Sequence, residues 1–478
     1  MKNFYNKLLL PAAAAAAASQ AAPVTPPNVL LIMVDDLRPE LGCYGNTQII
    51  SPNIDALAKE GILFQRAHCN VPVCGASRAS LLTGVRPTPT RFVEAHTWAE
   101  RDLPGNLSLP KHFKDCGYTT VSLGKVFHQK HDCADSWSAE PWWPDGYPHM
   151  WNAYVTKENQ EEVRLSPKKI GPAWEIADCS DSSYPDGKTA EKAIEEMREL
   201  SSSEKPFFLA VGFLKPHLPH NAPKRYWDLY DAKTLQLADN RDKIPQNAPE
   251  CSVHQSGELR HGYSGVPTQS PLPDDYEKIL LHGYMACISY VDAQIGRVLN
   301  ELKTSGLSEN TIVILCGDNG YNLGEHTMWC KQCEYETSLG VPLMMKVPGI
   351  QGGKKVAGLV EYVDIYPTLC ELCGIPIPGT CDGTSFAALL RNPDLPGKPA
   401  IFSRYEKGDT VTTERFQYTE YRSTKGSLIG RMLYDHKKDP SENVNVVDNP
   451  EYKSVIDRMA QMLQTQREEV LHASPSAK

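Results

Sequence analysis

The sequence predicts an α/β fold in which helices sandwich a large, mixed or mostly parallel sheet, followed by a smaller C-terminal subdomain built on an antiparallel sheet. Apolar, β-rich runs alternate with amphipathic helical segments over most of the chain. These runs are apolar throughout, so they fit strands that helices cover on both faces of a sheet. Beyond about residue 395 the pattern changes to alternating and β-branched positions, which predict an antiparallel meander.

Four of the apolar runs are predicted strands that end abruptly in polar residues. In an open α/β sheet, ligands bind just beyond the carboxyl ends of the strands. The four ends therefore predict one site, although they lie far apart in the sequence. The runs are NVLLIMVDD (28–36), TTVSLGKVFH (119–128), PFFLAVGFLKPHLPH (206–220) and TIVILCGDNG (311–320), and their terminal polar residues include Asp35, Asp36, Lys125, His128, Lys215, His217, His220, Asp318 and Asn319.

Helical segments lie between these strands and at the end of the chain. Ser51 or Asn53 is predicted to cap the first helix, and Gly306 to close the third. The last helix is expected to pack against the C-terminal meander. The segments are SPNIDALAKEGILF (51–64), PDGKTAEKAIEEMREL (185–200), PDDYEKILLHGYMACISYVDAQIGRVLNELKTSG (273–306) and PEYKSVIDRMAQMLQTQREEV (450–470).

The predicted organisation is a large domain over residues 27–395 and a smaller one over 396–478, joined near the Pro- and Gly-rich stretch 375–399. A chain of 478 residues that is 41% hydrophobic has enough apolar material for such a core.

The N-terminus has the pattern of a signal peptide over residues 1–22, with Lys2 and Lys7 ahead of a Leu- and Ala-rich stretch. We therefore expect a secreted or periplasmic protein. A low-complexity Ala helix at the start of a cytosolic protein is the alternative. No other apolar run approaches the roughly 18 residues of a membrane helix, so no membrane span is expected.

The formal charge of −9 argues against a nucleic-acid partner, because a surface that follows phosphates needs clustered Lys and Arg. It does not exclude an anionic substrate, since a few local cations or a metal ion reverse the field inside one cleft.

Fourteen cysteines are many for a chain of this length. In an exported protein some are expected to pair. Cys330 with Cys333 and Cys370 with Cys373 have a spacing that also suits zinc, but a zinc site needs two such pairs brought together. Disulfides or plain thiols are therefore preferred.

The acidic pairs at two strand ends predict a metal site. Asp35, Asp36 and Asp318 supply carboxylates and Asn319 an amide oxygen, and such ligands suit Ca²⁺ or Mg²⁺. Aspartates at a strand end also cap helices, but two such pairs at separate strand ends favour the metal.

The stretch CGASRASLLTG (74–84) predicts a turn that enters a helix, with Cys74 near its N-terminus and Arg78 about one turn further along. Both features favour negative charge at Cys74. The residues alone leave three readings open, namely a thiolate nucleophile, a bound anion or a buried core cysteine.

The same stretch matches the sulfatase signature C-x-[PA]-S-R followed by LLTG, with Ala76 where proline is commoner. Other segments agree, including DDLRP, LGCYG, SPNIDALA, GKVFH, KPH and CGDNGYNLGEH, over roughly residues 27 to 440. The chain therefore resembles the formylglycine-dependent type I sulfatases of the alkaline phosphatase superfamily, most of all the iduronate-2-sulfatase group. That group tends to have Asp-His where this chain has Asp318-Asn319.

This resemblance implies that Cys74 is oxidised to Cα-formylglycine by the formylglycine-generating enzyme. The hydrated aldehyde then offers one hydroxyl to attack sulfur and a second to expel sulfate. Asp35, Asp36, Asp318, Asn319 and residue 74 would bind Ca²⁺, or alternatively Mg²⁺. By the same resemblance Arg78 and Lys125 would hold the diol, and His128 would be the base. His217 and Lys331 would bind sulfate and assist the leaving group, with one or the other as the proton donor. His220 and His326 would have supporting roles.

The implied activity is hydrolysis of sulfate esters on a carbohydrate, with 2-O-sulfated uronic acid or a related sugar as the expected substrate. A glycosaminoglycan and an algal polysaccharide are both possible sources. The alternatives are a phosphomonoester or phosphonate monoester hydrolase on the same fold, and a sulfated-glycan-binding protein in which Cys74 is unmodified. Loops over 129–180 and 220–275, rich in Trp, Tyr and Pro, are expected to select the sugar.

Overall fold

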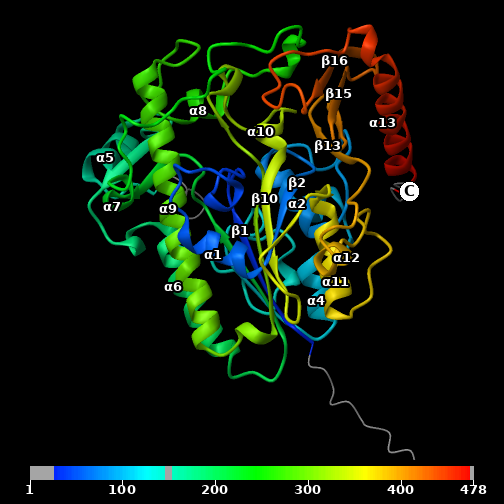
Figure 1. The fold of residues 1–478 in the computed structure, drawn as a ribbon. Helices are drawn as coiled ribbons and strands as arrows, with labels where there is room; N and C mark the ends of the chain where they lie inside the picture. The colour runs from blue at the N-terminus through cyan, green and yellow to red at the C-terminus, as the bar shows by residue number, and fades with distance from the viewer. Residues whose placement is uncertain (1–25, 146–152, 474–478) are drawn as a thin grey trace, which may run out of the picture.

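The structure is a computed structural model that describes residues 26–145 and 153–473. The predicted signal peptide over residues 1–22 lies outside these residues. Within them, no helix combines the length and the apolar character that crossing a bilayer requires. The predicted architecture is confirmed, with helices on both faces of a mixed sheet and a separate antiparallel sheet near the C-terminus (Figure 1).

The main sheet has the strand order β11-β2-β10-β7-β1-β5-β3, and β12 also pairs with β2. The four strands at one side, β7, β1, β5 and β3, are mutually parallel, whereas β10 runs antiparallel to both β7 and β2. The bounds are β1 Asn28–Val34, β2 Ile62–His68, β3 Thr119–Gly124, β5 Phe207–Phe213, β7 Thr311–Gly317, β10 Gly340–Lys346, β11 Lys354–Val356 and β12 Val360–Glu361.

One face of this sheet packs against α1 (Pro52–Glu60), α6 (Pro185–Leu200) and α9 (Asp274–Thr304). The other face packs against α2 (Cys74–Thr83), α4 (Leu109–Asp115), α11 (Ile365–Cys373) and α12 (Ala387–Arg391). Strands β1, β5 and β7 are buried along their whole length, as the continuous apolar runs predict. Figure 1 shows the two helical layers on either side of the central strands.

The first predicted helix begins where the sequence places it but ends earlier. It ends at Glu60, and the residues from Ile62 onward, which the sequence reading placed in the helix, begin β2. Ser51 occupies the N-cap position, but its side chain makes no capping hydrogen bond. The long helix α9 ends at Thr304, and Gly306 follows with a φ of 73°, a left-handed conformation that glycine adopts without strain.

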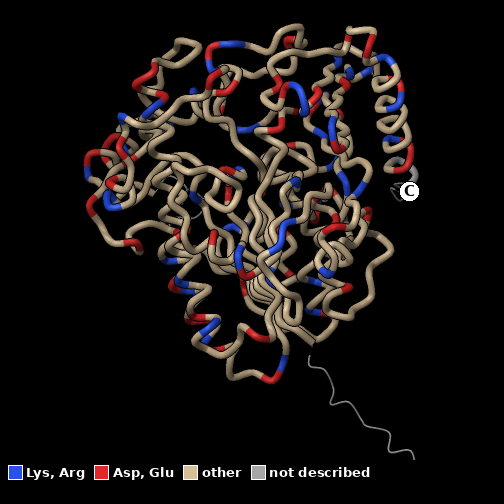
Figure 2. The backbone as a smooth tube through the Cα atoms, in the orientation of Figure 1, with Lys and Arg blue, Asp and Glu red and all other residues tan. Residues whose placement is uncertain are grey.

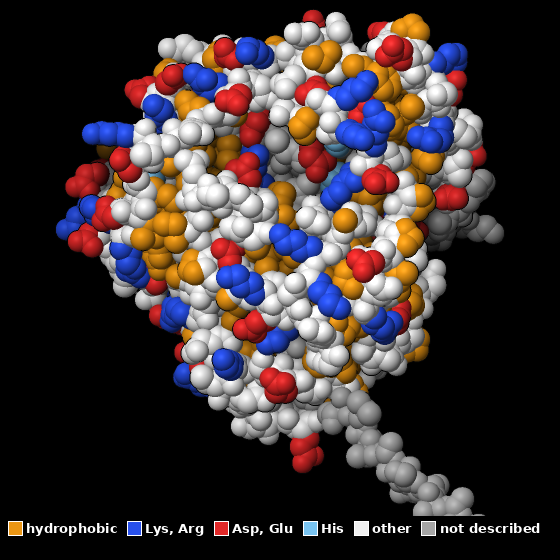
Figure 3. All heavy atoms as spheres, viewed as in Figure 1, with side chains coloured by type: hydrophobic (Ala, Val, Ile, Leu, Met, Phe, Trp, Pro, Cys, Tyr) orange, Lys and Arg blue, Asp and Glu red, His pale blue; other side chains and the backbone are white. Residues whose placement is uncertain are grey.

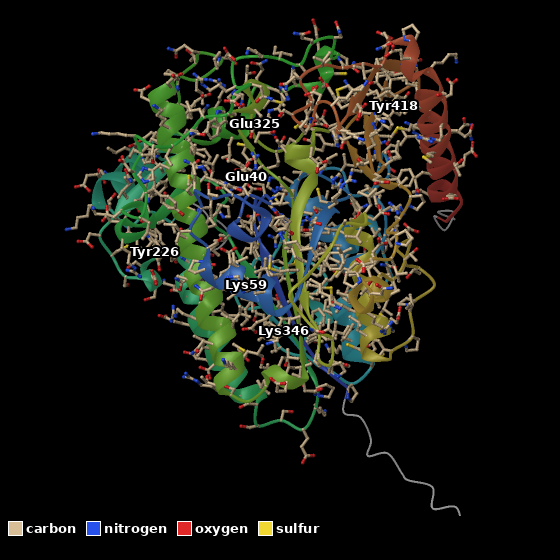
Figure 4. All side chains as sticks on the ribbon, viewed as in Figure 1. Glu40, Lys59, Tyr226, Glu325, Lys346 and Tyr418 are labelled. Carbon is tan, nitrogen blue, oxygen red and sulfur yellow. The ribbon has the colours of Figure 1, made fainter. Side chains whose placement is uncertain are left out.

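The C-terminal sheet has the order β13-β14-β15-β16, with every neighbouring pair antiparallel. The final helix α13 (Lys453–Ala473) packs on it through Ile456, Met459 and Leu463, which contact Val411 and Leu433 in a small core. This confirms the predicted meander and its covering helix, while the domain boundary near residue 395 stays a prediction. The strands are Ile401–Tyr405, Gly408–Thr412, Phe416–Arg422 and Leu428–Asp435, and Tyr418 of β15 is labelled in Figure 4.

Shorter elements form the loops around the sheet. Two two-stranded sheets join β4 (Trp174–Ala177) to β6 (His220–Pro223) and β8 (Asn322–Leu323) to β9 (Trp329–Cys330). Charged residues of both signs alternate along the outer helices α6 and α13 (Figure 2). The short helices are α3 Ala99–Asp102, α5 Lys157–Leu165, α7 Lys224–Trp227, α8 Gly257–Gly262 and α10 Glu336–Leu339.

Candidate active site

The carboxyl ends of β7, β1 and β5 lie level with one another. Val34, the last residue of β1, is in register with Gly317 of β7 and Phe213 of β5. The backbone continues this register, because the N–H of Asp35 donates to the Phe213 carbonyl and the N–H of Asp318 to the Val34 carbonyl, each at 3.1 Å. The polar residues after these strands therefore enter one region.

Cys74 is the first residue of α2, as the sequence predicts, and its side chain is buried. The chain packs tightly here, since a Cβ on Gly75 would lie 1.9 Å from the carbonyl oxygen of Ala95. One turn along the helix, Arg78 is fully buried and its Nε donates to Asp318 Oδ2 at 2.8 Å. Helix α2 thus presents Cys74 and Arg78 to the strand ends.

The four predicted oxygen ligands lie together. The Asp36 N–H donates to Asp318 Oδ1 at 3.0 Å, and Asn319 Nδ2 donates to Asp36 Oδ1 at 2.8 Å. Single acceptor atoms of Asp35, Cys74 and Asp318 all lie within 4.8 Å of one another. Asp35 Oδ1 and Asn319 Oδ1 are buried and have no hydrogen-bond partner among the described residues. Orphaned oxygens in such a cluster fit a bound hard cation.

Three buried cations face these carboxylates. Lys125 Nζ donates to Asp35 Oδ2, and Lys331 Nζ donates to Asp36 Oδ2 at 2.8 Å. Arg78 is 3.6 Å from Asp35 Oδ1 through Nη2. Two of them, Arg78 and Lys125, contact Asp35 directly, so positive charge surrounds the position beside Cys74.

The surroundings shift the pKa values of Asp35 and Asp318 in opposite directions. Burial raises the pKa of Asp35, but Lys125, His217 and Arg78 outweigh it and hold the pKa well below its usual range. Burial and the neighbouring Asp35 raise the pKa of Asp318 to about 7. A divalent cation would relieve this crowding of carboxylates.

Burial raises the pKa of the Cys74 thiol to about 12, although Lys125 and Lys331 act in the opposite direction. The thiol is therefore neutral at pH 7. Of the readings that the sequence left open, an unmodified thiolate nucleophile is disfavoured.

His217 and Lys331 meet at a residue that no sequence motif contains. Glu258, in the six-residue helix α8, accepts from Lys331 Nζ at 2.8 Å and lies 3.1 Å from His217 Nε2. Lys331 and His217 lower the pKa of Glu258 despite its burial, so its carboxylate is ionised. The only sequence signal is its position in the loop region 220–275, which was expected to contact the substrate.

His128 is half-buried, and its Nδ1 has no hydrogen-bond partner among the described residues. Burial and then Lys125 hold its pKa well below the usual value of 6.5. Its ring packs edge-to-face against His96, with centroids 5.5 Å apart. A neutral imidazole with a free nitrogen beside Lys125 is suited to accept a proton.

His220 and His326, the two other histidines for which the sequence predicts a role, lie outside the acidic cluster. His220 is fully buried in β6 and packs edge-to-face on Tyr284, whose hydroxyl donates to the Asp36 carbonyl. His220 therefore supports the site through Tyr284, which holds the backbone of Asp36. His326 contacts Asn240 and the Ser441 carbonyl instead.

His326 also lines a cavity of about 890 Å³, together with Arg38, Glu40 and Glu325. Arg38 donates to Glu325 at 2.8 Å and to Glu40 at 2.5 Å, and both glutamates are labelled in Figure 4. On the face shown in Figure 3, acidic and basic side chains are interspersed.

All fourteen cysteines lie within the described residues, and each is a free thiol. The side-chain clusters with metal-binding geometry in residues 26–145 and 153–473 do not include Cys330, Cys333, Cys370 or Cys373. Plain thiols are thus the state that the structure shows.

A family model described as Sulfatase matches residues 27–375. The chain belongs to the sulfatase family. A second model, described as N-sulphoglucosamine sulphohydrolase, C-terminal, matches residues 324–469 of this sulfatase. The sulfatase is 35% identical to iduronate 2-sulfatase of Mus musculus over 90% of its own length and 92% of the relative. These similarities make it a sulfuric ester hydrolase.

Solved structures share the sulfatase fold. A phosphonate monoester hydrolase of Agrobacterium radiobacter superposes with a TM-score of 0.74 at 23% identity, covering 93% of this chain and 96% of that one. A 2-O GAG sulfatase gives a TM-score of 0.70 at 23% identity, covering 93% and 92%. At this identity the likeness concerns the fold alone.

Proposed function

We propose that this sulfatase hydrolyses the sulfate ester of 2-O-sulfated uronic acid, or of a related sugar, in a glycosaminoglycan or another sulfated polysaccharide. The observation that carries this proposal is the 35% identity to iduronate 2-sulfatase over 90% of the chain. The charges agree with it, because Arg78, Lys125 and Lys331 are gathered at a single site that can receive an anionic ester.

Cys74 is the proposed site of formylglycine, made by the formylglycine-generating enzyme during export. Its place at the start of α2, next to Arg78 and the acidic cluster, supports this role. When converted, residue 74 supplies a hydrated aldehyde as the oxygen nucleophile for sulfur. The buried neutral thiol alone lacks that chemistry.

Asp35, Asp36, Asp318 and Asn319 would hold Ca²⁺, or alternatively Mg²⁺, because all four supply hard oxygen ligands. When bound, the ion supplies positive charge that favours an ionised oxygen nucleophile. The unpartnered oxygens of Asp35 and Asn319 are the feature of this chain that fits the ion.

The basic residues and histidines of the site have the remaining roles in the proposed reaction. Arg78 and Lys125 orient the oxygen at position 74, and Lys331 binds a sulfate oxygen. His128, whose pKa is held low, accepts the proton that must leave before sulfate is released. His217 donates a proton to the departing sugar oxygen.

The test measures, by ion chromatography, the release of sulfate from two isomeric disaccharides. One carries its sulfate on the 2-hydroxyl of the uronic acid, and the other carries it on the 6-hydroxyl of the neighbouring sugar. We expect release from the first and little from the second. Parallel rates on 4-nitrophenyl sulfate and 4-nitrophenyl phosphate separate this proposal from a phosphatase. Dominant phosphate release, or binding of sulfated glycan without turnover, would contradict it.

We also propose that the protein is secreted or periplasmic, as the pattern of residues 1–22 suggests. N-terminal sequencing of the protein from culture medium, periplasm and cytoplasm tests this. Recovery of the uncleaved chain from the cytoplasm alone would contradict it.

A further inference from the structure

Glu258 lies between the two residues proposed to act on the leaving group. Its carboxylate accepts from Lys331 Nζ at 2.8 Å and lies 3.1 Å from His217 Nε2. The side chain of Glu258 is 21% exposed, whereas that of Lys331 is 1% exposed, so solvent reaches Glu258 but hardly reaches Lys331. Nothing in the sequence motifs assigns this glutamate a role.

The hydrogen bonds of His217 leave one nitrogen for this contact. Nδ1 lies 2.5 Å from the Leu218 carbonyl oxygen. A carbonyl oxygen only accepts, so Nδ1 is a donor. Nε2 is then the nitrogen available to the site, and Glu258 at 3.1 Å is a closer carboxylate than Asp36 at 3.9 Å. Glu258 therefore sets the direction in which Nε2 points.

The ammonium group of Lys331 is fixed in the same way. It has three hydrogens, of which one goes to Asp36 and one to Glu258, both at 2.8 Å. The third remains for a sulfate oxygen. Without Glu258 the ammonium group would keep only its hydrogen bond to Asp36 among these two contacts, and its other two hydrogens could change direction.

We propose that Glu258 is a positioning residue for sulfate-ester hydrolysis, whose carboxylate holds His217 Nε2 and Lys331 Nζ at the place where the sugar oxygen departs. As the nucleophile bonds to sulfur, the bond between sulfur and the sugar oxygen breaks and its electron pair stays on that oxygen. The proton of Nε2 then leaves its contact with Glu258 and moves to the oxygen, which departs as an alcohol, and His217 is left as a neutral imidazole with its hydrogen on Nδ1. This inference rests on the leaving-group roles proposed for His217 and Lys331.

The experiment compares one variant on two leaving groups. Glu258→Gln keeps the shape of the side chain but removes its charge. For the 2-O-sulfated disaccharide, whose alkoxide leaves poorly, we expect kcat/KM to fall by about 100-fold. For 4-nitrophenyl sulfate, whose phenolate needs no proton, we expect a loss below about 3-fold. The ratio of the two rates does not depend on how much of a preparation is folded.

Two further variants sharpen the result. Glu204→Gln, an exposed glutamate outside both loops that are expected to select the sugar, should leave both rates unchanged. His217→Ala combined with Glu258→Gln should lose much less on the disaccharide than the product of the two single losses, because Glu258 acts mainly through the His217 proton and Lys331 keeps its hydrogen bond to Asp36.

Equal losses on both esters, additive losses in the double variant, or no loss at all would overturn the inference. If the unaltered sulfatase releases sulfate from neither ester, the proposed function itself fails, which is a distinct outcome.

Discussion

Arg78 Nε donates a hydrogen bond to Asp318 Oδ2 at 2.8 Å, although 240 residues separate them in the chain. Both side chains are fully buried. The pair fixes the first turn of α2, and with it residue 74, against the end of β7. Asp318 thus has two functions here, since its other oxygen accepts from the backbone of Asp36 and Asn319.

Asp318→Ala should remove the metal and the activity together. The substitution deletes a carboxylate of the proposed ligand set and leaves the buried Arg78 without the carboxylate to which its Nε donates, at a cost of about 3–5 kcal/mol. Metal content by inductively coupled plasma mass spectrometry and melting temperature are the measurements. Asp242→Asn, at an exposed position, serves as the control. Unchanged metal content in the folded variant would show that the ligand set is wrong.

Cys74→Ser and Cys74→Ala should abolish turnover and leave the fold intact. Alanine has no group at Cβ that oxidation could turn into the aldehyde, and an unoxidised serine offers one hydroxyl instead of the two of a hydrated aldehyde. Intact-mass analysis of the unaltered peptide provides the matching observation, because conversion of the thiol to the aldehyde lowers the mass by roughly 18 Da. Substantial activity in Cys74→Ala, or a peptide of unmodified mass in a fully active preparation, would rule out this chemistry.

The sequence predicts this site well where the signal is local. Asp35 and Asp318 follow buried strands directly, so the rule for carboxyl ends of parallel strands places them together. Cys74 and Arg78 are related by one helical turn. Glu258 could not be found in this way, because α8 is short and its contact with Lys331 spans 73 residues of chain.

Two of the predictions made from the sequence, the end of the first helix and its cap by Ser51, were wrong for physical reasons. Ile62 continues an apolar pattern from α1, and periodicity alone does not show where a buried helix becomes a buried strand. Ser51 stands at the N-cap position, but its hydroxyl lies within 3.4 Å of Asp55 rather than of a backbone N–H of the first turn. The loop around His96 carries no motif, so its contact with His128 came only from the fold.

Gly75→Ala should destabilise the protein and reduce activity. The added methyl group would meet the Ala95 carbonyl at 1.9 Å, so the loop that carries His96 must move away from residue 74. Overpacking of this kind costs about 1–3 kcal/mol. Urea unfolding and kcat measure the two effects.

Gly379→Ala is the matched control, because a Cβ there meets nothing within 4 Å. Equal free energies of unfolding for the Gly75 and Gly379 variants would mean that the loop around Ala95 moves away without loss of stability.

His436 should make stability depend on pH at the junction with the C-terminal sheet. Its Nε2 lies 2.9 Å from Glu442 Oε1, and the side chain is 15% exposed. Burial lowers the pKa of His436, but the hydrogen bond to Glu442 and the charges of Glu442 and Glu336 outweigh it and raise the pKa to about 8. The protonated ring therefore stabilises the folded state.

The sign follows from the two protonation equilibria. Because the folded pKa lies above the ordinary 6.5, the contribution is complete below pH 6.5 and is lost as the pH rises through about 8. The shift corresponds to about 2 kcal/mol. The free energy of unfolding of His436→Gln should thus fall below that of the unaltered protein by this amount at pH 6, and the difference should shrink by pH 9. His261→Gln, at an exposed histidine, should show no such trend. A difference that stays constant across this range would mean that His436 contributes through packing and not through its charge.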